Sequence, residues 1–335
     1  MVGQSNSYNT LPKGSTILVT GANGLIGSHC ANQALQHGYK VRGTTRSLEK
    51  NKWLVETFEK KYGKDAFELV EVKDMQHAGA FDKAVEGCSA VIHVATVITF
   101  DPDPENVIPP TLAGTREILK SAAKTPSVKR VVYTSSSGAL QTTTDKPITV
   151  TQDTWNDEAV RLVQDPTLFA TLPDPVKSVT TYCASKTLAE KACFEFVEQE
   201  KPHFVLNTVA PNMNIGPTIH PTQPASSSAM NYIDVRDDGR LHLAAAIFDD
   251  VQGERIWGMA GDYNFNDIID EFAKKDPKWR DHERFEDKRD LTVYDRSRSI
   301  ELLRRLGQDG FVSLADSIRD NIAGEYPHPC AGEIC

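Results

Sequence analysis

A tyrosine and a lysine, Tyr182 and Lys186, lie four residues apart in the segment YCASK. On a helix this spacing places both side chains on the same face. An ammonium group close to a phenol favours the phenolate, so we expect the tyrosine pKa to fall below its usual value of about 10. Tyr182 would then suit acid–base catalysis near neutral pH.

Three serines, Ser135–Ser137, end the apolar segment VKRVVYTSSS upstream of this pair. A serine hydroxyl beside the tyrosine can hydrogen-bond a carbonyl oxygen on which negative charge develops. A Tyr–Lys pair at this spacing also arises by chance. The tyrosine could simply be a buried residue, the lysine a surface residue of a helix, and the three serines an ordinary loop at a strand end. The placement favours chemistry, because the pair opens a predicted helix after a strand that ends in serines, downstream of a glycine-rich turn.

The glycine-rich turn stands in the segment STILVTGANGLIG at 15–27, which reads as a strand, a tight turn and the start of a helix. Gly21 permits the turn, Gly24 lets the backbone approach phosphate oxygens, and Gly27 lets the helix pack against the strand. The helix predicted from Leu25 presents free N–H groups and its positive dipole end to a pyrophosphate. The predicted dinucleotide-binding residues of this turn are Gly21, Asn23, Gly24, Leu25, Ile26 and Gly27.

The second predicted strand, at 40–45, ends without the acidic residue that holds the ribose 2′-hydroxyl in NAD-selective sites. Arg46 follows it, and Lys50 lies one helical turn further on. An arginine makes charge-assisted hydrogen bonds to the 2′-phosphate of NADP, so the sequence predicts NADP(H) as the cofactor. Lys52 is an alternative to Lys50, and Arg46 could equally be a solvated surface cation.

Residues after the third and fourth predicted strands complete the cofactor site. Asp74 and Met75 follow the third strand, where the Asp74 carboxylate could accept a hydrogen bond from the adenine amino group or cap a helix. Ala95 ends the fourth predicted strand and Thr96 follows it. We assign these residues to the site because ligands of open parallel sheets bind at the carboxyl ends of the strands.

Strands that alternate with helices predict an α/β fold, a Rossmann-type doubly wound parallel sheet with a smaller C-terminal substrate-binding region. Six strands are expected, within the segments 15–20, 40–45, 67–73, 90–95, 128–136 and 203–210. The main helices are expected at 48–62, 107–125, 179–200, 237–249, 264–274, 295–306 and 313–323. The predicted domains are a flexible leader at 1–14, a dinucleotide-binding domain at 15–210 with an insertion at 138–177, a mostly helical substrate-binding region at 211–325 and a tail at 326–335.

Composition narrows the class of protein. The 335 residues carry a net charge of −9, which argues against nucleic-acid binding. No apolar run approaches the length of about 20 residues that spans a membrane, and the polar N-terminus predicts a cytoplasmic protein. The six cysteines have no metal-type pairing, so no metal is predicted. Cys330 and Cys335 in the tail could pair or bind a metal, but their spacing disfavours it.

Four segments, TGANGLIG, TSSS, YCASK and APNMNIGP, resemble the extended short-chain dehydrogenase/reductase superfamily. Within it the chain is most similar to NADPH-dependent yeast and fungal carbonyl (aldehyde) reductases, and next to dihydroflavonol reductases. The resemblance implies that NADPH reduces an aldehyde or ketone to an alcohol. It also implies that Ser136 is the catalytic serine and Tyr182 the proton donor, while Lys186 binds the nicotinamide ribose and lowers the tyrosine pKa.

The resemblance implies a role for one further position, and the chain departs from the family pattern at two others. The backbone of Pro211 would lie near the nicotinamide carboxamide, whereas Thr111 stands where the family often has an asparagine of the proton relay. The segment between Gly216 and Tyr232 is short and rich in Pro and Ser, so either the substrate pocket is open or the insertion at 138–177 closes it. His220 and Met230 of that region are candidates for substrate contact, or are simply solvated.

Two other functions fit the same residues. One is epimerase or dehydratase chemistry on a nucleotide sugar, which usually favours NAD. The other is a non-enzymatic NADP-sensing regulator, a class that typically lacks the Tyr–Lys pair. The expected partner is a small carbonyl substrate, and the chain is expected to be a monomer or a homodimer paired through the helices at 107–125 and 179–200.

Overall fold

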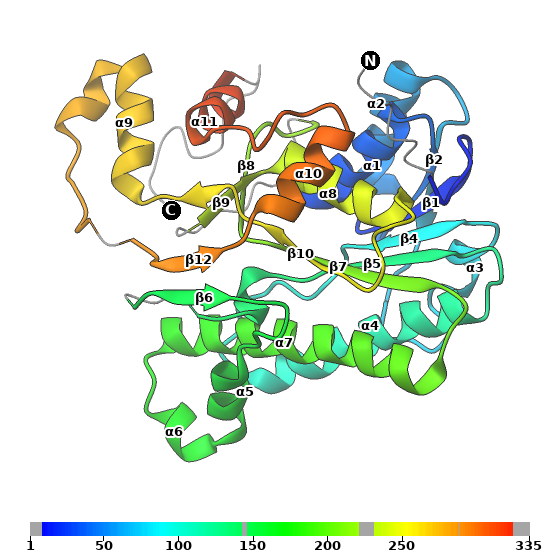
Figure 1. The fold of residues 1–335 in the computed structure, drawn as a ribbon, viewed down its shortest axis with the longest axis horizontal. Coiled ribbons are helices and arrows are strands. Elements are labelled where there is room, and N and C mark those ends of the chain that lie inside the picture. The colour runs from blue at the N-terminus through cyan, green and yellow to red at the C-terminus, as the bar shows by residue number, and fades with distance from the viewer. Residues whose placement is uncertain (1–8, 143–145, 221–230, 288, 324–335) are drawn as a thin grey trace.

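The computed structural model describes residues 9–142, 146–220, 231–287 and 289–323. Its centre is a sheet of seven parallel strands in the order β10-β7-β5-β4-β1-β2-β3 (Figure 1). This order confirms the predicted doubly wound sheet. Strands β1, β2 and β3 follow one another toward one edge, and the strands from β4 onward follow one another toward the other edge, so the strand order reverses between β1 and β4. The strands are β1 (Thr16–Thr20), β2 (Lys40–Thr45), β3 (Phe67–Glu71), β4 (Ala90–His93), β5 (Arg130–Thr134), β7 (Val205–Pro211) and β10 (Arg255–Gly258).

Helices cover both faces of the sheet, as crossovers between parallel strands require. Apolar side chains of α1 and α8 pack in one core cluster with strand residues, and those of α4 and α7 in another on the opposite face (Figure 1). The first face carries α1 (Leu25–Gln36), α2 (Lys52–Tyr62), α8 (Val235–Ile247) and α10 (Ser297–Arg305). The second carries α3 (Asp82–Val85), α4 (Ile108–Ala123) and α7 (Asp174–Glu200).

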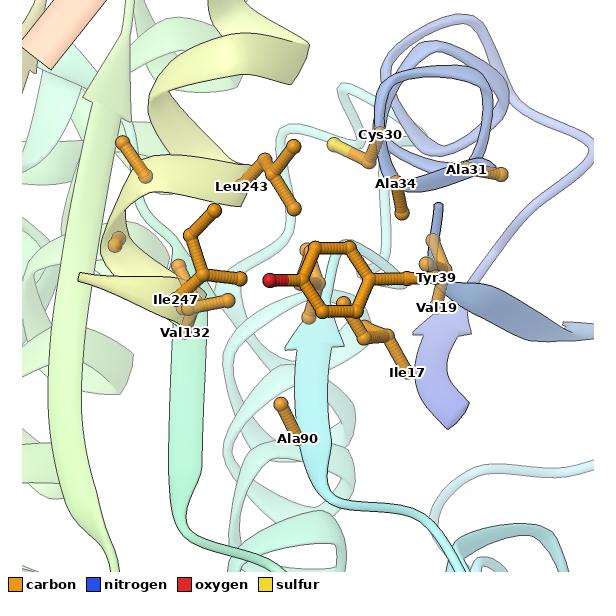
Figure 2. Packing of buried hydrophobic residues seen from close by; sticks show 14 of the residues in the cluster. Ile17, Val19, Cys30, Ala31, Ala34, Tyr39, Ala90, Val132, Leu243 and Ile247 are labelled. Atoms are coloured by element: carbon orange, nitrogen blue, oxygen red, sulfur yellow. The ribbon is translucent and has the colours of Figure 1, made fainter. Parts of the chain in front are cut away.

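The contact between α1 and α8 fixes the helix that follows the glycine-rich turn. Figure 2 shows the sulfur of Cys30 on α1 pointing toward Leu243 of α8, and both residues belong to the same core cluster. The backbones of the two helices approach closely at Gly239 of α8. A Cβ added there would lie only 2.9 Å from the carbonyl of His29 on α1. The C-terminal part of the chain therefore holds α1 in place from outside the sheet.

The short strands outside the central sheet were not predicted, and three further features of the described residues differ from the sequence-based expectation. Strand β10 was not predicted, and it joins the sheet edge beside β7. Helix α7 begins five residues before 179, because Pro175 stands in its first turn, where the missing N–H has no partner to lose. The part of the predicted leader that the structure describes is packed, since Leu11 is buried and the Thr10 amide donates to the carbonyl of Ile247.

Helix packing and strand pairing both attach the insertion at 138–177 to the rest of the molecule. Its helices α5 (Asp157–Gln164) and α6 (Pro166–Ala170) follow one another, and α5 packs against α7. Its strand β6 (Ile148–Val150) pairs in parallel with β12 (Thr292–Tyr294) of the C-terminal region (Figure 1). The remaining elements are β8 (Met213–Ile215), β9 (Asn231–Asp234), β11 (Gly261–Asp262), α9 (Phe265–Lys275) and α11 (Leu314–Ala323), with four short 3-10 turns.

Across the described ranges, none of the helices combines the length and the apolar character that crossing a bilayer requires. The predicted tail, Cys330, Cys335 and Met230 lie outside the described residues.

Candidate active site

The glycine-rich turn adopts the conformation that its sequence predicts. Gly21 has φ +64°, and its amide donates to the hydroxyl of Thr44 at the end of β2 (3.2 Å). A Cβ at Gly27 would overlap the carbonyl group of Gly21, so α1 presses directly on the turn. Gly24 occupies the N-cap of α1 and has no side chain with which to cover the helix amides. The turn therefore leaves a backbone cradle at the positive end of a helix.

The loops after β1 and β4 are joined at the point where the strand order reverses. The Thr20 hydroxyl accepts from the amides of Val94 and Ala95 at 3.1 and 3.0 Å. A Cβ at Gly21 would lie 3.3 Å from the Cα of Ala95. The Thr96 hydroxyl is buried and finds no hydrogen-bond partner in the described part of the chain. A dinucleotide fits here for two reasons. The glycine-rich turn leaves no room for added side chains at Gly21 and Gly27, and the buried Thr96 hydroxyl has no hydrogen-bond partner among the described residues.

The two cations predicted to bind the 2′-phosphate of NADP are accessible to solvent. Arg46 and Lys50 are exposed, and their side chains make no hydrogen bond or ion pair within the described ranges. Lys52, the alternative to Lys50, instead pairs with Glu49 at 2.6 Å. Asp74 is also exposed, and its carboxylate accepts from the amide of Gln76 at 2.9 Å, while Met75 packs against the core of the second face.

The three candidate catalytic side chains come from two elements that meet beside β7. Ser136 directly follows β5, where it caps the turn η3 (Ser137–Ala139) and its Oγ accepts from the Gly138 amide at 3.1 Å. Tyr182 and Lys186 lie on α7, which packs against η3. Lys186 is 2% exposed, and its Nζ donates to the carbonyl of Thr134 at 3.0 Å. Strand end and helix thus bring the serine, phenol and ammonium together.

The pKa of the phenol differs in direction from the sequence-based expectation. Burial raises the pKa of Tyr182 to about 12, and the neighbouring Ser136 only partly opposes this rise. Burial also lowers the pKa of Lys186 to about 8, against the attraction of Glu190. The expected direction of the tyrosine pKa is therefore wrong for this arrangement, because burial of the phenol outweighs the lowering expected from Lys186. A phenol with this pKa stays protonated at neutral pH.

One residue beside the phenol was not predicted. The ring centroid of Phe100 lies 5.3 Å from that of Tyr182, and Phe100 is 48% exposed. Its φ of +49° is unusual for an aromatic residue, and such strain often marks a functional site. The hydroxyl of Thr181 donates to the carbonyl of Pro102 and ties this loop to α7. No motif indicated Phe100, because a single aromatic residue in a loop has no distinctive pattern.

Three other predicted positions have defined environments. Pro211 is buried at the end of β7, where Gly258 of β10 approaches its backbone closely. The Thr111 hydroxyl donates to the carbonyl of Val107 in its own helix at 2.7 Å, so that hydroxyl is already in use. His220 stacks on Trp53 of α2 with ring centroids 4.7 Å apart, which places it against the helix that follows Arg46.

Comparisons with known proteins identify the relatives of this chain. The sequence profile described as "NAD dependent epimerase/dehydratase family" matches residues 17–264. Aldehyde reductase 2 of Sporidiobolus salmonicolor is 37% identical over 94% of this chain and 97% of that protein. Ketoreductase adrE of Penicillium rubens is 34% identical over 94% and 98%. The crystal structure of yeast methylglyoxal/isovaleraldehyde reductase Gre2 complexed with NADPH superposes with a TM-score of 0.73, at 28% identity, over 91% of this chain and 96% of that one.

Proposed function

We propose, since the chain belongs to the NAD dependent epimerase/dehydratase family, that it is an NADPH-dependent reductase that converts an aldehyde or ketone to an alcohol. Similar proteins named aldehyde reductase and ketoreductase support this reaction over epimerisation or dehydration of a nucleotide sugar. The observation that carries the proposal is the phenol of Tyr182 beside Ser136, at the same edge of the parallel sheet as the glycine-rich turn.

The described residues suit NADP(H). The cradle at Gly21 and the N-terminus of α1 would hold the pyrophosphate, and Arg46 with Lys50 would hold the 2′-phosphate. Asp74 and Met75 would lie at the adenine. The remaining contacts would come from Ala95 and Thr96 at the end of β4, Lys186 at the nicotinamide ribose, and the Pro211 backbone at the carboxamide. When bound, the cofactor supplies the hydride that reduces the carbonyl carbon.

The chain's own groups handle the carbonyl oxygen and the proton. The Ser136 Oγ accepts from the Gly138 amide, which leaves its own proton to donate to the carbonyl oxygen. Tyr182 then gives its phenolic proton to that oxygen as negative charge develops there. Lys186, held by the Thr134 carbonyl one helical turn away, provides the positive charge that favours the phenolate left behind. Phe100 forms an apolar wall beside the phenol.

The test is the loss of NADPH absorbance with a panel of aryl ketones, ketoesters and aldehydes, with NADH as the control nucleotide. We expect oxidation of NADPH by the wild type and none by Tyr182→Phe, which should still bind NADPH as judged by the fluorescence of the nucleotide. Tyr62→Phe is the matched control, because it removes a phenolic hydroxyl from α2 and should retain turnover. Absence of NADPH oxidation with every carbonyl, or full turnover by Tyr182→Phe, would refute the proposal.

A further inference from the structure

A buried carboxylate continues the catalytic face of α7. Glu190 lies four residues after Lys186, which lies four residues after Tyr182, so the three side chains lie along one stripe of the helix. Glu190 is 0% exposed. A carboxylate removed from water is costly unless charged or polar donors satisfy its oxygens, so its partners matter.

The donors to Glu190 come from three strands of the central sheet. Oε1 accepts from the Thr208 hydroxyl of β7 at 2.6 Å and from Nε of Arg255 at 3.0 Å. Oε2 accepts from the Ser135 hydroxyl at the end of β5 at 2.7 Å and from Nη2 of Arg255 at 3.2 Å. Four donors therefore occupy a group that can accept about four hydrogen bonds. The carboxylate is satisfied without any contact to a ligand.

The guanidinium that completes this set is itself held rigidly. Arg255 lies at the start of β10 and stacks on the ring of Trp155 at 3.7 Å. Its Nη1 donates to the carbonyls of Gln152 and Thr154 at 2.7 and 2.8 Å. Both carbonyls belong to the insertion, so the pair of Glu190 and Arg255 joins α7, the sheet and the insertion.

The position of Ser135 connects this pair to the candidate catalytic groups. Ser135 stands between Thr134, whose carbonyl accepts from Lys186, and Ser136. Glu190 thus holds the strand end through Ser135 while it belongs to the helix that carries Tyr182 and Lys186. We propose, on the basis of the reductase function above, that Glu190 is a positioning residue that fixes Ser136 against Tyr182 and keeps Lys186 positively charged.

The electrostatic half of the proposal follows from the groups that face Lys186. On α7 these are Tyr182, Glu190 and Cys193, and burial raises the pKa of both the phenol and the thiol, so neither is charged near neutral pH. On the strands they are His93 of β4, whose pKa burial lowers to about 3, and the ring of Tyr133, 5.4 Å from the ammonium. Glu190 is the one negative charge among these groups, and it also pairs with Arg255 at 3.0 Å. Without Glu190, Lys186 would stay buried and lose the nearby negative charge, and the Arg255 guanidinium would lose its carboxylate.

The test is Glu190→Gln in the full chain, which keeps the side-chain volume and removes the charge. We expect the Lys186 pKa to fall by at least about one unit, as loss of an adjacent opposite charge does. The readout is the titration of the lysine Nζ and Cε signals by NMR, with the Lys186 signal assigned by its absence in Lys186→Arg. We further expect kcat at pH 7 to drop at least about tenfold while the Kd for NADPH changes less than about threefold.

Two variants separate positioning from simple destabilisation. Thr208→Val removes one hydrogen bond to the carboxylate and keeps the charge, so we expect it to lower Tm without moving the Lys186 titration. Ser135→Ala cuts the link to the strand end, so we expect it to lower kcat without moving that titration. It also tests the positioning half if Glu190→Gln does not fold.

A wild-type titration and kcat in Glu190→Gln would overturn the proposal, as would the same titration shift in Thr208→Val or a wild-type kcat in Ser135→Ala. The titration does not depend on turnover. If the wild type reduces no carbonyl, the reductase function fails while the effect of Glu190 on Lys186 is still measured.

Discussion

Removal of the Arg46 side chain should change nucleotide selectivity and little else. The guanidinium is exposed and makes no hydrogen bond or ion pair within the described ranges, so Arg46→Ala breaks no contact of the fold. Surface substitutions of this kind change the free energy of unfolding by less than about 0.5 kcal/mol. Any larger effect on function can therefore be attributed to the lost interaction with the nucleotide.

The size of that effect follows from the number and exposure of the bonds. Hydrogen bonds to charged groups contribute about 1.5–3 kcal/mol, equal to roughly 10- to 150-fold in affinity. Because Arg46 is exposed, screening by salt and water places the expected loss in the lower part of that range, at about 10- to 30-fold. NADH has no 2′-phosphate, so its affinity should not change.

The assay is the Kd for NADPH and for NADH by fluorescence titration at two salt concentrations, beside KM in the reductase assay. We expect Arg46→Ala to weaken NADPH alone, and to do so more at low salt than at high salt. Lys52→Ala is the matched control, because Lys52 is an exposed cation on the same segment that already pairs with Glu49. An equal loss for both nucleotides, or the same loss in Lys52→Ala, would refute the assignment of Arg46 to the 2′-phosphate.

Three other outcomes follow from the geometry. Gly27→Ala should lower Tm and weaken NADPH binding more than tenfold, because its Cβ would lie 2.9 Å from the carbonyl carbon of Gly21; unchanged NADPH affinity would contradict this. Phe100→Ala should change KM for bulky aryl ketones and leave the Kd for NADPH unaltered, and a changed Kd would place the ring elsewhere. Activity should fall as pH rises through about 8, because Lys186 loses its proton there, whereas the Tyr182 phenol with a pKa of about 12 keeps its own. The kcat profile of Lys186→Met should lack that limb.

The same Lys186 shift has a predicted effect on stability. Its folded pKa of about 8 lies below the value of about 10.4 in the unfolded chain, so between these values the unfolded state binds more protons. This group therefore makes the folded state more stable as pH rises from 8 to 10, in the window where activity declines. Thermal unfolding of wild type and Lys186→Met across this range would separate loss of function from loss of fold.

The sequence predicted those parts of the fold that have a local signal. Strand β1 and the turn at Gly21 combine an apolar run with a glycine spacing that few other structures require. The alternation of strands and helices along the chain then predicted the parallel, doubly wound sheet. Strand β10 escaped because RIWG is four residues long and has neither the alternation nor the length of a recognisable strand. The segment forms a strand because its backbone hydrogen-bonds to the exposed edge of β7, a contact between residues far apart in the sequence.

The candidate site was predictable in its members but not in its electrostatics. The spacing of Tyr182 and Lys186 showed that they share a face, and the structure has them on one helix beside Ser136. The direction of the tyrosine pKa depends on the burial of the phenol and on the hydroxyl of Ser136 beside it. Neither quantity is encoded by a local pattern. The role of Glu190 was hidden for the same reason, because its four donors come from strands far apart in the chain.

The insertion holds elements that carry the candidate catalytic residues at two places, which indicates that it helps to position those residues. On one side the Asn156 side chain donates at 2.9 Å to the carbonyl of Gly138, where the insertion begins, and so fixes the turn that Ser136 caps. On the other side Arg255, held by carbonyls of the insertion, binds Glu190 on the helix of Tyr182. A segment that only covered a pocket would need neither contact. Changes within the insertion should therefore alter kcat as well as substrate range, since they move the serine and the phenol relative to each other.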